Sequence, residues 1–483
     1  MLFGTKKKPR IKNSEGKSIE LDENNKEFKN ALDLVLNTNE SLYLTGKAGS
    51  GKTTFLHFLR TMTRKQTVVL APTGIASVNA QGQTIHSFFH IAPSIYSPDE
   101  KRMRFDTKDE KKAFFKAFPQ RKDKIEMFKK LETIIIDEVS MVRCDLMDVV
   151  DTILRVYRRK NSPFGGVQMV FIGDMFQLPP VVTSNESEIL RANYPTEFFF
   201  SSRAVSKLNL RYIELKKIYR QKDNDFIDIL NNIRYGMVLR EDIAKLNQRV
   251  NPLADGKKNN AIFLTATNRE AQKINQERLD AIQEKEYTFK ASIDGNVMEN
   301  EYPTDETLKL KCGAQVILLR NHFEQGYFNG KSGVFVGVER DEDGEEFLLV
   351  DITDNHFGKR TVYVSRDVWQ KTQYILSEEG TITEKSVGSF TQFPIKLAWA
   401  ITIHKSQGMT FDNIIVDAGY AFAAGQIYVA LSRCTSLEGI ELLRPLNSRA
   451  VICDSRIISY TSTETPTAEI EETLNESTKS KCN

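Results

Sequence analysis

One stretch of the chain combines glycines, a lysine and a threonine at a spacing that could bind phosphate. Gly46-Lys-Ala-Gly-Ser-Gly-Lys-Thr53 fits the pattern G-x-x-x-x-G-K-[ST], follows an apolar run and precedes a helix-forming run at 54–64. Glycines let backbone N–H groups converge on phosphate, and the N-terminus of the following helix attracts the same anion. Lys52 would contact the β- and γ-phosphates of a nucleotide, and Thr53 would bind Mg²⁺. The alternative is a glycine turn without a nucleotide role. Phosphate contacts are expected from Gly46, Ala48, Gly49, Ser50, Gly51, Lys52, Thr53 and Thr54.

Two adjacent acids end another apolar run, in Ile134-Ile-Ile-Asp-Glu138. Doubly wound sheets bind ligands at the carboxyl ends of their strands, which is where this pair would lie. We predict that Asp137 holds Mg²⁺, directly or through water, and that Glu138 polarises the attacking water. The alternative is a pair of solvated acids at the end of a strand. The phosphate loop upstream in the same predicted sheet favours the catalytic interpretation.

A glutamine and two arginines complete the candidate catalytic set. Gln177 lies in Gly173-Asp-Met-Phe-Gln-Leu-Pro-Pro180, after another apolar run, and a carboxamide can donate to a γ-phosphate while accepting from water. Arg220 and Arg433 are candidates for charge stabilisation from the second α/β region, so that bound nucleotide would close the cleft. The alternatives are a surface loop residue for Gln177 and weak surface ion pairs for the arginines.

The composition indicates a folded protein of several domains. At 483 residues, with 40% hydrophobic and 27% charged residues, about three domains are expected. No apolar stretch approaches the roughly 20 residues of a membrane helix, so no membrane association is expected. Five scattered cysteines without a C-x-x-C pair fit a reducing, cytoplasmic environment, and the six histidines have no metal-ligand spacing. A net charge of +3 does not by itself indicate nucleic-acid binding.

Short apolar runs divide the chain into two alternating strand and helix regions. The first region has runs at 41–44, 68–70, 134–136 and 169–172, and the second has runs at 261–264 and 414–416. Continuous apolar runs of this length are typical of buried strands in parallel sheets. The fold class is therefore predicted to be α/β.

Two segments interrupt this alternation. Residues 99–130 hold twelve Lys or Arg and seven Asp or Glu, interleaved with five phenylalanines, which predicts a small helical insertion. These phenylalanines could form the core of the insertion or a platform on which bases stack. Residues 308–369 show β-type runs at 315–319, 333–336, 347–350 and 361–364 between Gly and Asn turns. That pattern predicts a small antiparallel barrel inserted in the second region.

The motifs together resemble the Pif-one (petite integration frequency) family of superfamily one DNA helicases. The resemblance runs from about Leu42 to Leu443. Its motifs are Ala71-Pro-Thr-Gly-Ile-Ala76, Gly82-Gln-Thr-Ile-His-Ser-Phe88, Pro163-Phe-Gly-Gly-Val-Gln168 leading into the Gln177 segment, Ile403-His-Lys-Ser-Gln-Gly-Met-Thr410 and Ala430-Leu-Ser-Arg433. Several long matches in the same order make coincidence negligible.

The resemblance implies two RecA-like P-loop motor domains with ATP between them. It implies a wedge domain near 91–130 in the first and an SH3-like β-barrel near 308–390 in the second. The motor domains are then expected at 21–210 and 211–460, between a flexible basic segment at 1–20 and a disordered acidic tail at 461–483. Further implications are 5′-to-3′ movement on single-stranded DNA, action on forks, duplexes, RNA–DNA hybrids and G-quadruplexes, and a monomer as the acting species. Gln177, Arg220, Gly408 and Arg433 would also contact the nucleotide. The direction of movement comes from the resemblance alone.

Polar residues after the predicted strands are candidates for DNA contact. Short hydroxyl, amide and basic side chains suit phosphate oxygens, which fix a track without reading sequence. For any one of these residues a capping or turn role is an equal alternative. The candidates are Pro72, Thr73 and His86 in the first region and Thr267, Asn268, His404 and Lys405 in the second.

One departure from the family and two rival functions stay open at this point. Upstream of the phosphate loop the family carries a glutamine that reads adenine, but residues 21–28 contain none. Asn24 or Asn25 could substitute, because a carboxamide offers the same donor and acceptor pair. The rival functions are a DNA-binding remodeller or clamp with an incidental ATPase, and a helicase subunit of a recombination or conjugation machine.

Overall fold

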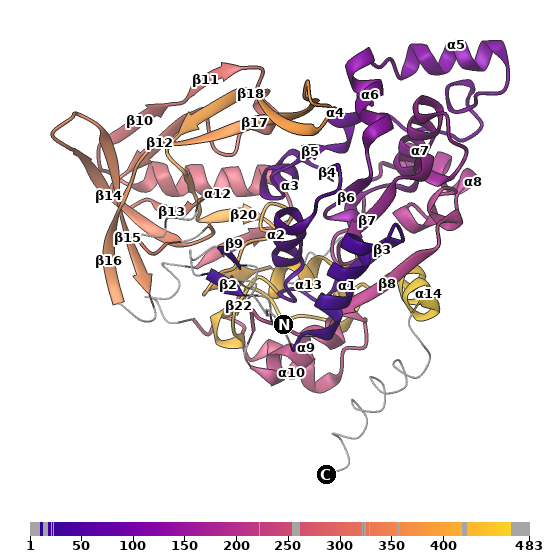
Figure 1. The fold of residues 1–483 in the computed structure, drawn as a ribbon. Helices are drawn as coiled ribbons and strands as arrows, with labels where there is room; N and C mark the ends of the chain where they lie inside the picture. Colours follow the sequence, from indigo (N-terminus) through magenta and orange to yellow (C-terminus); the bar gives the residue numbers. More distant parts are fainter. Residues whose placement is uncertain are drawn as a thin grey trace, which may run out of the picture.

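Two parallel sheets lie next to each other, each covered by helices, with an antiparallel β insertion extending from the second (Figure 1). The protein is described from a computed structural model, which covers residues 10–12, 18–20, 22, 24–221, 223–253, 261–320, 322, 325–327, 329–354, 358–417 and 423–464. The predicted α/β class is confirmed.

The first sheet has the strand order β5-β4-β6-β7-β3-β8, and all its strands are parallel. Leu42 and Leu44 face a core that includes α1 and α2, whereas Tyr43 faces a core that includes α7, so helices cover both faces. The strands are β3 (Ser41–Gly46), β4 (Thr67–Ala71), β5 (Gln83–Thr84), β6 (Thr133–Ile136), β7 (Gln168–Ile172) and β8 (Leu210–Leu215). The helices are α1 (Lys26–Asn37), α2 (Lys52–Met62), α3 (Gly74–Asn79), α4 (Ile85–Phe89), α7 (Cys144–Arg158) and α8 (Ser184–Asn193), with short 3-10 turns η2 (Val139–Met141), η3 (Pro163–Gly166), η4 (Phe199–Ser201) and η5 (Val205–Lys207). We call this unit the first lobe.

The second sheet has the order β20-β9-β21-β22 and is also parallel. We call this sheet and its helices the second lobe. Its strands are β9 (Ile262–Thr265), β20 (Ala400–Thr402), β21 (Ile414–Val416) and β22 (Ile440–Leu442). Its helices are α9 (Asn224–Arg234), α10 (Arg240–Asn247), α12 (Asn268–Ala281) and α13 (Gln426–Leu431), with turns η8 (Leu437–Gly439) and η9 (Ser448–Ala450). The boundary expected at 210 falls at the start of β8, which still pairs with β3 of the first sheet.

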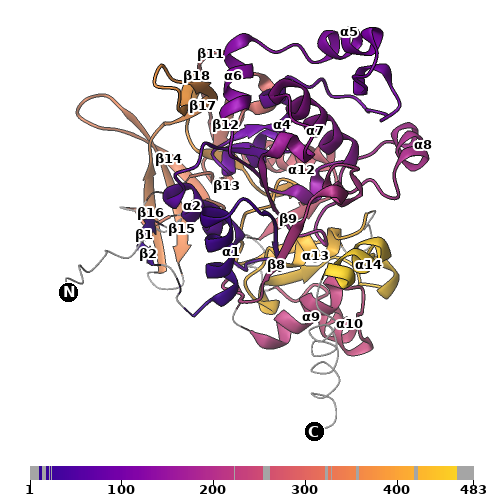
Figure 2. The same ribbon diagram turned by 45° about the vertical axis from the view of Figure 1, so that its right-hand side comes forward.

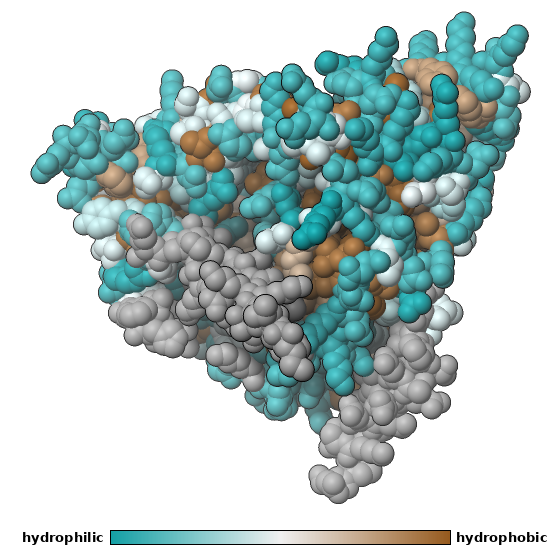
Figure 3. Space-filling model, in the orientation of Figure 1, coloured by the Kyte–Doolittle hydropathy of each residue, from teal (hydrophilic) through white to brown (hydrophobic). Residues whose placement is uncertain are grey.

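The basic, phenylalanine-rich segment at 99–130 is helical, as predicted. It consists of η1 (Lys101–Met103), α5 (Lys108–Ala117) and α6 (Lys122–Lys130), and both ribbon views place α5 at the outer margin of the molecule (Figures 1 and 2). Phe114, Phe118 and Phe128 are buried in the core of the first lobe, which supports the core interpretation for these three. Phe115 is 46% exposed, and the apolar surface over α5 is a small patch among hydrophilic residues (Figure 3).

An antiparallel β insertion occupies residues 286–397. Its main sheet has the order β16-β15-β14-β13-β19, and the four predicted β runs form β13 to β16. The insertion extends beyond the range 308–390 on both sides. The main strands are β13 (Gln315–Leu318), β14 (Ser332–Arg340), β15 (Glu346–Asp354), β16 (Gly358–Val364) and β19 (Ile395–Leu397). The others are β10 (Glu286–Lys290), paired with β12 (Thr307–Lys311), and β11 (Ser292–Gly295), paired with the hairpin β17 (Asp367–Leu376) and β18 (Ile382–Gln392), with a turn η6 (Glu299–Glu301).

The β17–β18 hairpin crosses from the insertion to the first sheet. The backbone N–H of Val69 in β4 donates to the Tyr374 hydroxyl at 3.0 Å, and Gln83 Nε2 donates to the Thr372 carbonyl at 2.8 Å. The Tyr374 ring is buried in the core of the first lobe, where it meets Phe88 edge to face. The hairpin is therefore a direct connection between the two lobes.

The ends of the described chain are more ordered than the sequence predicted. Within the first twenty residues, which were expected to be flexible, β1 (Arg10–Lys12) pairs antiparallel with β2 (Ser18–Glu20). Helix α14 (Ser455–Glu464) continues to residue 464, although the disordered tail was expected from 461. Its Tyr460 stacks on Phe200 of the first lobe at a centroid distance of 4.0 Å. The rest of the expected tail, 465–483, lies outside the described residues. None of the helices in the described part of the chain is both long and apolar enough to span a membrane.

Candidate functional site

The phosphate loop connects β3 to α2 at the carboxyl edge of the first sheet. Gly49 and Gly51 have φ of 79° and 93°, a region that glycine adopts without steric cost. Lys52 Nζ lies over the loop and donates to the carbonyls of Gly46 and Lys47 at 2.6 and 3.1 Å. Burial lowers the pKa of Lys52, although the charges of nearby acids act in the opposite direction. Around it, Ala48 and Ser50 are buried, Thr54 is half-buried and Thr53 is exposed.

The two acids of the second motif follow β6 directly. Burial, together with the charge of Glu138, raises the pKa of Asp137 to about 7, while Lys52 acts to lower it. Burial also raises the pKa of Glu138, against the charges of Lys52 and Arg433. A lysine and two crowded carboxylates therefore share one half-buried site. Such a site fits a divalent cation bound through oxygen, because the cation would relieve the repulsion between the acids.

Gln177 lies in the loop after β7, beside the phosphate loop in the sheet order. Its side chain is buried, and its Nε2 donates to Asp174 Oδ2 at 3.4 Å. Asp174 is completely buried and forms an ion pair with Arg234 at the end of α9, with 3.0 Å between Oδ1 and Nη2. The structure thus places Gln177 at the carboxyl edge of the first sheet, where it was predicted. Its partner Asp174 was not among the predicted site residues.

The two candidate arginines lie together at this site, but Arg220 arrives from an unexpected direction. It follows β8 of the first sheet, its Cβ lies so close to Gly49 that an added Cβ there would come within 2.5 Å of it, and the neighbouring Tyr219 N–H donates to the Gly49 carbonyl. Arg220 thus lies in the connection between β8 of the first lobe and α9 of the second, and not on an element of the second sheet. Its Nη1 donates to the carbonyl of Ser432 at 3.2 Å.

Arg433 does belong to the second lobe, as predicted. It is 2% exposed and its Nε donates to the Val429 carbonyl at 3.0 Å. Burial and the charge of Arg433 lower the pKa of Arg220 to about 9, and Glu138 acts to raise the pKa of Arg433. Both guanidinium groups therefore interact electrostatically with the site, Arg433 with Glu138 and Arg220 with Lys52.

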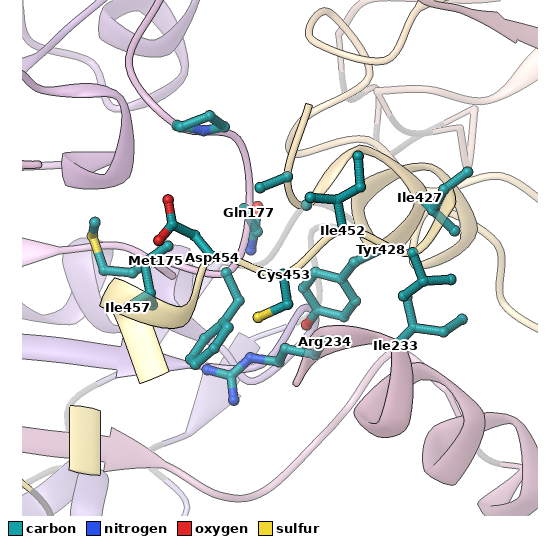
Figure 4. A pocket seen from close by; sticks show the side chains of 15 residues that line it. Met175, Gln177, Ile233, Arg234, Ile427, Tyr428, Ile452, Cys453, Asp454 and Ile457 are labelled. Carbon is teal, nitrogen blue, oxygen red and sulfur yellow. The ribbon is translucent and has the colours of Figure 1, made fainter. Parts of the chain in front are cut away.

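Tyr428 of α13 connects the second lobe to the phosphate loop. The Ala48 N–H donates to the Tyr428 hydroxyl at 2.9 Å, and that hydroxyl donates to Asp174 Oδ2 at 3.4 Å. Figure 4 shows the side chains of Gln177, Tyr428 and Arg234 approaching one another from the loop after β7, from α13 and from α9 around one narrow pocket. Sequence analysis missed Asp174, Arg234 and Tyr428. A usable signal existed for Arg234, which adjoins the apolar positions 226, 229, 230 and 233 on one face of α9.

Asn25, one of the two proposed substitutes for the missing adenine-reading glutamine, uses its side chain to cap a helix. Asn25 caps α1, its Oδ1 accepts from the Phe28 N–H at 3.0 Å, and its Nδ2 donates to the Tyr219 hydroxyl at 3.2 Å. Asn24 is exposed, and its N–H donates to Asp22. Asn25 therefore does not present a free donor and acceptor pair to a base.

The candidate DNA contacts of the first lobe follow β4 or lie in α4. Thr73 caps α3, because its Oγ1 accepts from the Ala76 N–H at 3.2 Å, yet it remains exposed. Pro72 and His86 are half-buried. Burial and the charge of Arg143 lower the pKa of His86, so this side chain is neutral at physiological pH.

In the second lobe, the corresponding residues follow β9 and β20. Thr267 caps α12 through the Glu270 N–H, and both Thr267 and Asn268 are exposed. His404 and Lys405 are half-buried after β20. A Cβ added to Gly408 would lie 3.8 Å from Nδ2 of Asn79 in α3. The loop that carries Gly408 thus approaches the first lobe, and its nucleotide contact stays a prediction.

Comparison with known proteins gives consistent results. A profile of the PIF1-like helicase family matches residues 20–244, and one of the UvrD-like helicase C-terminal domain matches 397–437. The chain is 31% identical to the human ATP-dependent DNA helicase PIF1 over 88% of its length, and it spans only 61% of that protein. It is 30% identical to the ATP-dependent DNA helicase Pif1 of Bdellovibrio bacteriovorus over 89% of this chain and 90% of the relative.

Solved structures of Pif1 from a Bacteroides species have the same fold. The complex with ADP-AlF4 is 38% identical, has a TM-score of 0.81 and is matched over 91% of this chain and 96% of that one. The unliganded form gives 0.80 at 38% identity, over 92% and 96%. The form bound to single-stranded DNA gives 0.62 at 37% identity, over 91% and 96%. The resemblance inferred from the motifs is thereby confirmed, and the chain belongs to the PIF1-like helicase family.

Proposed function

We propose that the protein is an ATP-dependent helicase that moves 5′-to-3′ along single-stranded DNA and separates duplexes. The observation that carries the proposal is the junction between the lobes, where Arg433 and Tyr428 of the second lobe reach the loop and acids of the first. A phosphate site built from two separately folded sheets responds to nucleotide by closing and to hydrolysis by opening. Relatives named as ATP-dependent DNA helicases support the same activity.

The side chains have distinct roles in the proposed reaction. Lys52 and the loop N–H groups would hold the β- and γ-phosphates, and Glu138 would orient the attacking water. Mg²⁺, held by Thr53 and Asp137, would supply positive charge to the phosphate oxygens. Arg220 and Arg433 would balance charge that develops in the transition state, and Gln177 would sense the γ-phosphate.

The DNA track would run across the two strand-end surfaces. Thr73 and Asn268 are exposed on opposite lobes, so a strand held by both sets of residues would be displaced when the lobes close. Phosphate contacts of this kind carry no sequence information, which suits a motor that must move over any sequence. Local melting costs about 1.4 kcal/mol per base-pair step, and stacking a freed base on an aromatic side chain recovers roughly 1–3 kcal/mol, so ATP is needed mainly for direction.

The structural comparisons support a rearrangement that accompanies DNA binding. At nearly equal identity and coverage, the unliganded Bacteroides structure has a TM-score of 0.80 with this chain, whereas the structure bound to single-stranded DNA has 0.62. We infer that the arrangement described above is the DNA-free one. The β insertion and its β17–β18 contact with the first lobe would move when DNA binds.

Finer elements of the proposal rest on the family. We propose on this basis that residues 99–130 act as a wedge and that the β insertion is SH3-like. We also propose action on G-quadruplexes and RNA–DNA hybrids, a role in genome maintenance and a monomer as the acting species. The exposed Phe115 and the lysines of α5 would lie near the fork. The relative whose structure concerns unwinding of forked DNA by two coordinating Pif1 helicases is a reason to test the monomer.

Unwinding of tailed duplexes tests the proposal. We expect the wild type to unwind a duplex with a 5′ single-stranded overhang, in the presence of ATP and Mg²⁺, and not one with a 3′ overhang. Lys52→Ala should abolish unwinding, because the phosphate loop loses the ammonium group that lies over it, while folding is checked by circular dichroism. Unwinding from the 3′ tail would contradict the polarity, and activity of Lys52→Ala would contradict the assigned site.

ATP turnover with and without single-stranded DNA separates this function from the rivals. A motor whose track spans both lobes should hydrolyse ATP much faster when the track is occupied. A DNA-binding remodeller or clamp with an incidental ATPase should show unchanged turnover. The helicase subunits of recombination and conjugation machines normally carry nuclease or relaxase domains, and the described residues form neither.

A further inference from the structure

Asp174 occupies the centre of a buried network that spans both lobes. Its Oδ1 receives Arg234 Nη2 at 3.0 Å and Nε at 3.3 Å, and its Oδ2 receives the Tyr428 hydroxyl and Gln177 Nε2, both at 3.4 Å. The same Tyr428 hydroxyl accepts from the Ala48 N–H of the phosphate loop. One carboxylate thus contacts the γ-phosphate sensor and both second-lobe helices that face it.

The surroundings hold this carboxylate ionised and fixed. Burial alone would raise the pKa of Asp174, but the charges of Arg234 and Lys52 bring it below its ordinary value. Arg234 is itself immobilised, because its guanidinium lies over the rings of Phe176 and Tyr235 at 4.3 and 4.9 Å. The ion pair between Asp174 and Arg234 therefore holds the loop after β7 in one position.

A carboxylate can select one orientation of a carboxamide. Glutamine can present either Nε2 or Oε1 to a neighbour, but a carboxylate accepts hydrogen bonds and donates none. Asp174 therefore favours the orientation in which Nε2 of Gln177 faces it and Oε1 faces away, free to accept from water. An asparagine at position 174 would accept and donate, and so would not select.

The network also depends on closure of the lobes. Asp174 and Gln177 belong to the first lobe, whereas Arg234 and Tyr428 belong to the second. Separation of the lobes would deprive the carboxylate of Arg234 and Tyr428, and so of its cationic hydrogen-bond donor, which is unfavourable unless the loop changes its conformation. The orientation of Gln177 and the contact with Ala48 would be lost in the same movement.

We propose that Asp174 is a positioning residue that fixes the carboxamide of Gln177 only when Arg234 and Tyr428 have closed onto it. Closure of the lobes is thereby coupled to the γ-phosphate sensor. This inference rests on the proposed ATPase activity and deepens it, since it states how the arrangement of the second lobe controls hydrolysis in the first.

Tyr428→Phe with Tyr235→Phe as its matched control tests the proposal. Both tyrosines carry a hydroxyl near Arg234, but only that of Tyr428 reaches Asp174 and Ala48. In steady-state ATP hydrolysis with single-stranded DNA, Tyr428→Phe should lower kcat about tenfold and leave KM for ATP within about twofold. Tyr235→Phe should leave both within about twofold. Equal loss in both variants, or unchanged kcat in Tyr428→Phe, would overturn the inference.

A second comparison separates positioning from stability. Asp174→Asn deprives the buried Arg234 of its closest carboxylate, leaving the longer 3.4 Å pair with Glu214, and should lower the melting temperature, whereas the double variant Asp174→Asn with Arg234→Met removes both charges and should recover part of it. The kcat of the double variant should remain at least about tenfold below wild type, because neither residue then orients Gln177. Recovery of kcat in step with the melting temperature would show a merely structural ion pair. A wild type that hydrolyses no ATP would instead reject the proposed function, and this inference with it.

Discussion

At the residue scale, the site depends on how closely the second lobe approaches the loop after β7. Gly425, which precedes α13, has φ of 75°, and a Cβ there would lie 2.4 Å from the Gln177 carbonyl oxygen and 2.6 Å from that of Phe176. Backbone atoms cannot give way as a flexible side chain can. Any other residue at this position would push α13, with Tyr428 and Arg433, away from the nucleotide site.

Gly425→Ala should therefore lower ATP turnover far more than a glycine replacement of equal backbone strain. Gly344, in the turn between β14 and β15, has φ of 84° and no atom within 4 Å of an added Cβ, so Gly344→Ala is the matched control. Both variants should lose about 1–2 kcal/mol of stability from the left-handed conformation. Only Gly425→Ala should lose about tenfold or more in kcat. Equal kcat in the two variants would show that the close approach has no catalytic consequence.

The residues identified from the sequence lie in short local patterns, whereas the missed residues meet through contacts between distant segments of the chain. The phosphate loop, Asp137 with Glu138, and Gln177 lie in short local patterns whose spacing follows from strand ends in a sheet. Asp174 lies inside one of these patterns, but its partners Arg234 and Tyr428 are remote in the chain, and only the folded lobes bring them to it. No local spacing encodes such a contact.

At the scale of elements, the β17–β18 hairpin stands out because it belongs to the β insertion and places a tyrosine in the core of the first lobe. The Val69 N–H in β4 donates to the hydroxyl of Tyr374 and not to a neighbouring strand. Around it, Arg60 pairs with Glu384 at 2.9 Å, and the Ile382 N–H donates to Gln66 Oε1. Burial raises the pKa of Tyr374 to about 12, so this hydroxyl stays protonated under all ordinary conditions.

Tyr374→Phe should destabilise the protein by about 1–3 kcal/mol, because it leaves a buried backbone N–H without its acceptor. Tyr363, on β16 of the same insertion, is 46% exposed, and Tyr363→Phe should change stability by less than about 0.5 kcal/mol. Urea unfolding monitored by circular dichroism gives both values. Amide hydrogen exchange at Val69 should also become faster in Tyr374→Phe alone. Equal stability of the two variants would mean that the hydrogen bond contributes nothing.

Strands of the insertion were predictable, whereas the place where the insertion docks was not. Short apolar runs separated by Gly and Asn turns identify β13 to β16, since both the runs and the turn residues are local signals. The docking of β17 and β18 places Tyr374 in the core of the first lobe, with Leu376 and Ile382 packed beside it, and these apolar residues stand among polar ones in a pattern that also fits a hairpin on the surface of the insertion. For the same reason, the continuation of α14 into a segment rich in Ser and Thr was unexpected.

At the scale of the whole molecule, three contacts stand out among those that hold the lobes together in the described arrangement. They are the Tyr428 and Asp174 network at the nucleotide site, the β17–β18 hairpin on β4, and α14, which follows the second lobe and packs on Phe200 of the first. If DNA binding requires the insertion to move, as proposed from the comparisons, then the hairpin contact opposes it. Apparent DNA affinity is set by the fraction of molecules in which the hairpin is released.

Weakening the hairpin contact should consequently tighten the binding of single-stranded DNA. A loss of about 1.4 kcal/mol in docking raises the released fraction about tenfold, so the Kd of Tyr374→Phe for an oligothymidylate should fall by up to that factor. Tyr363→Phe should bind as the wild type does. Binding must be compared by fluorescence anisotropy at one salt concentration, because phosphate contacts make affinity salt-dependent.

Small-angle X-ray scattering of the wild type should change on adding the oligonucleotide. An unchanged scattering profile, or equal affinity of both tyrosine variants, would mean that the hairpin stays docked while DNA is bound.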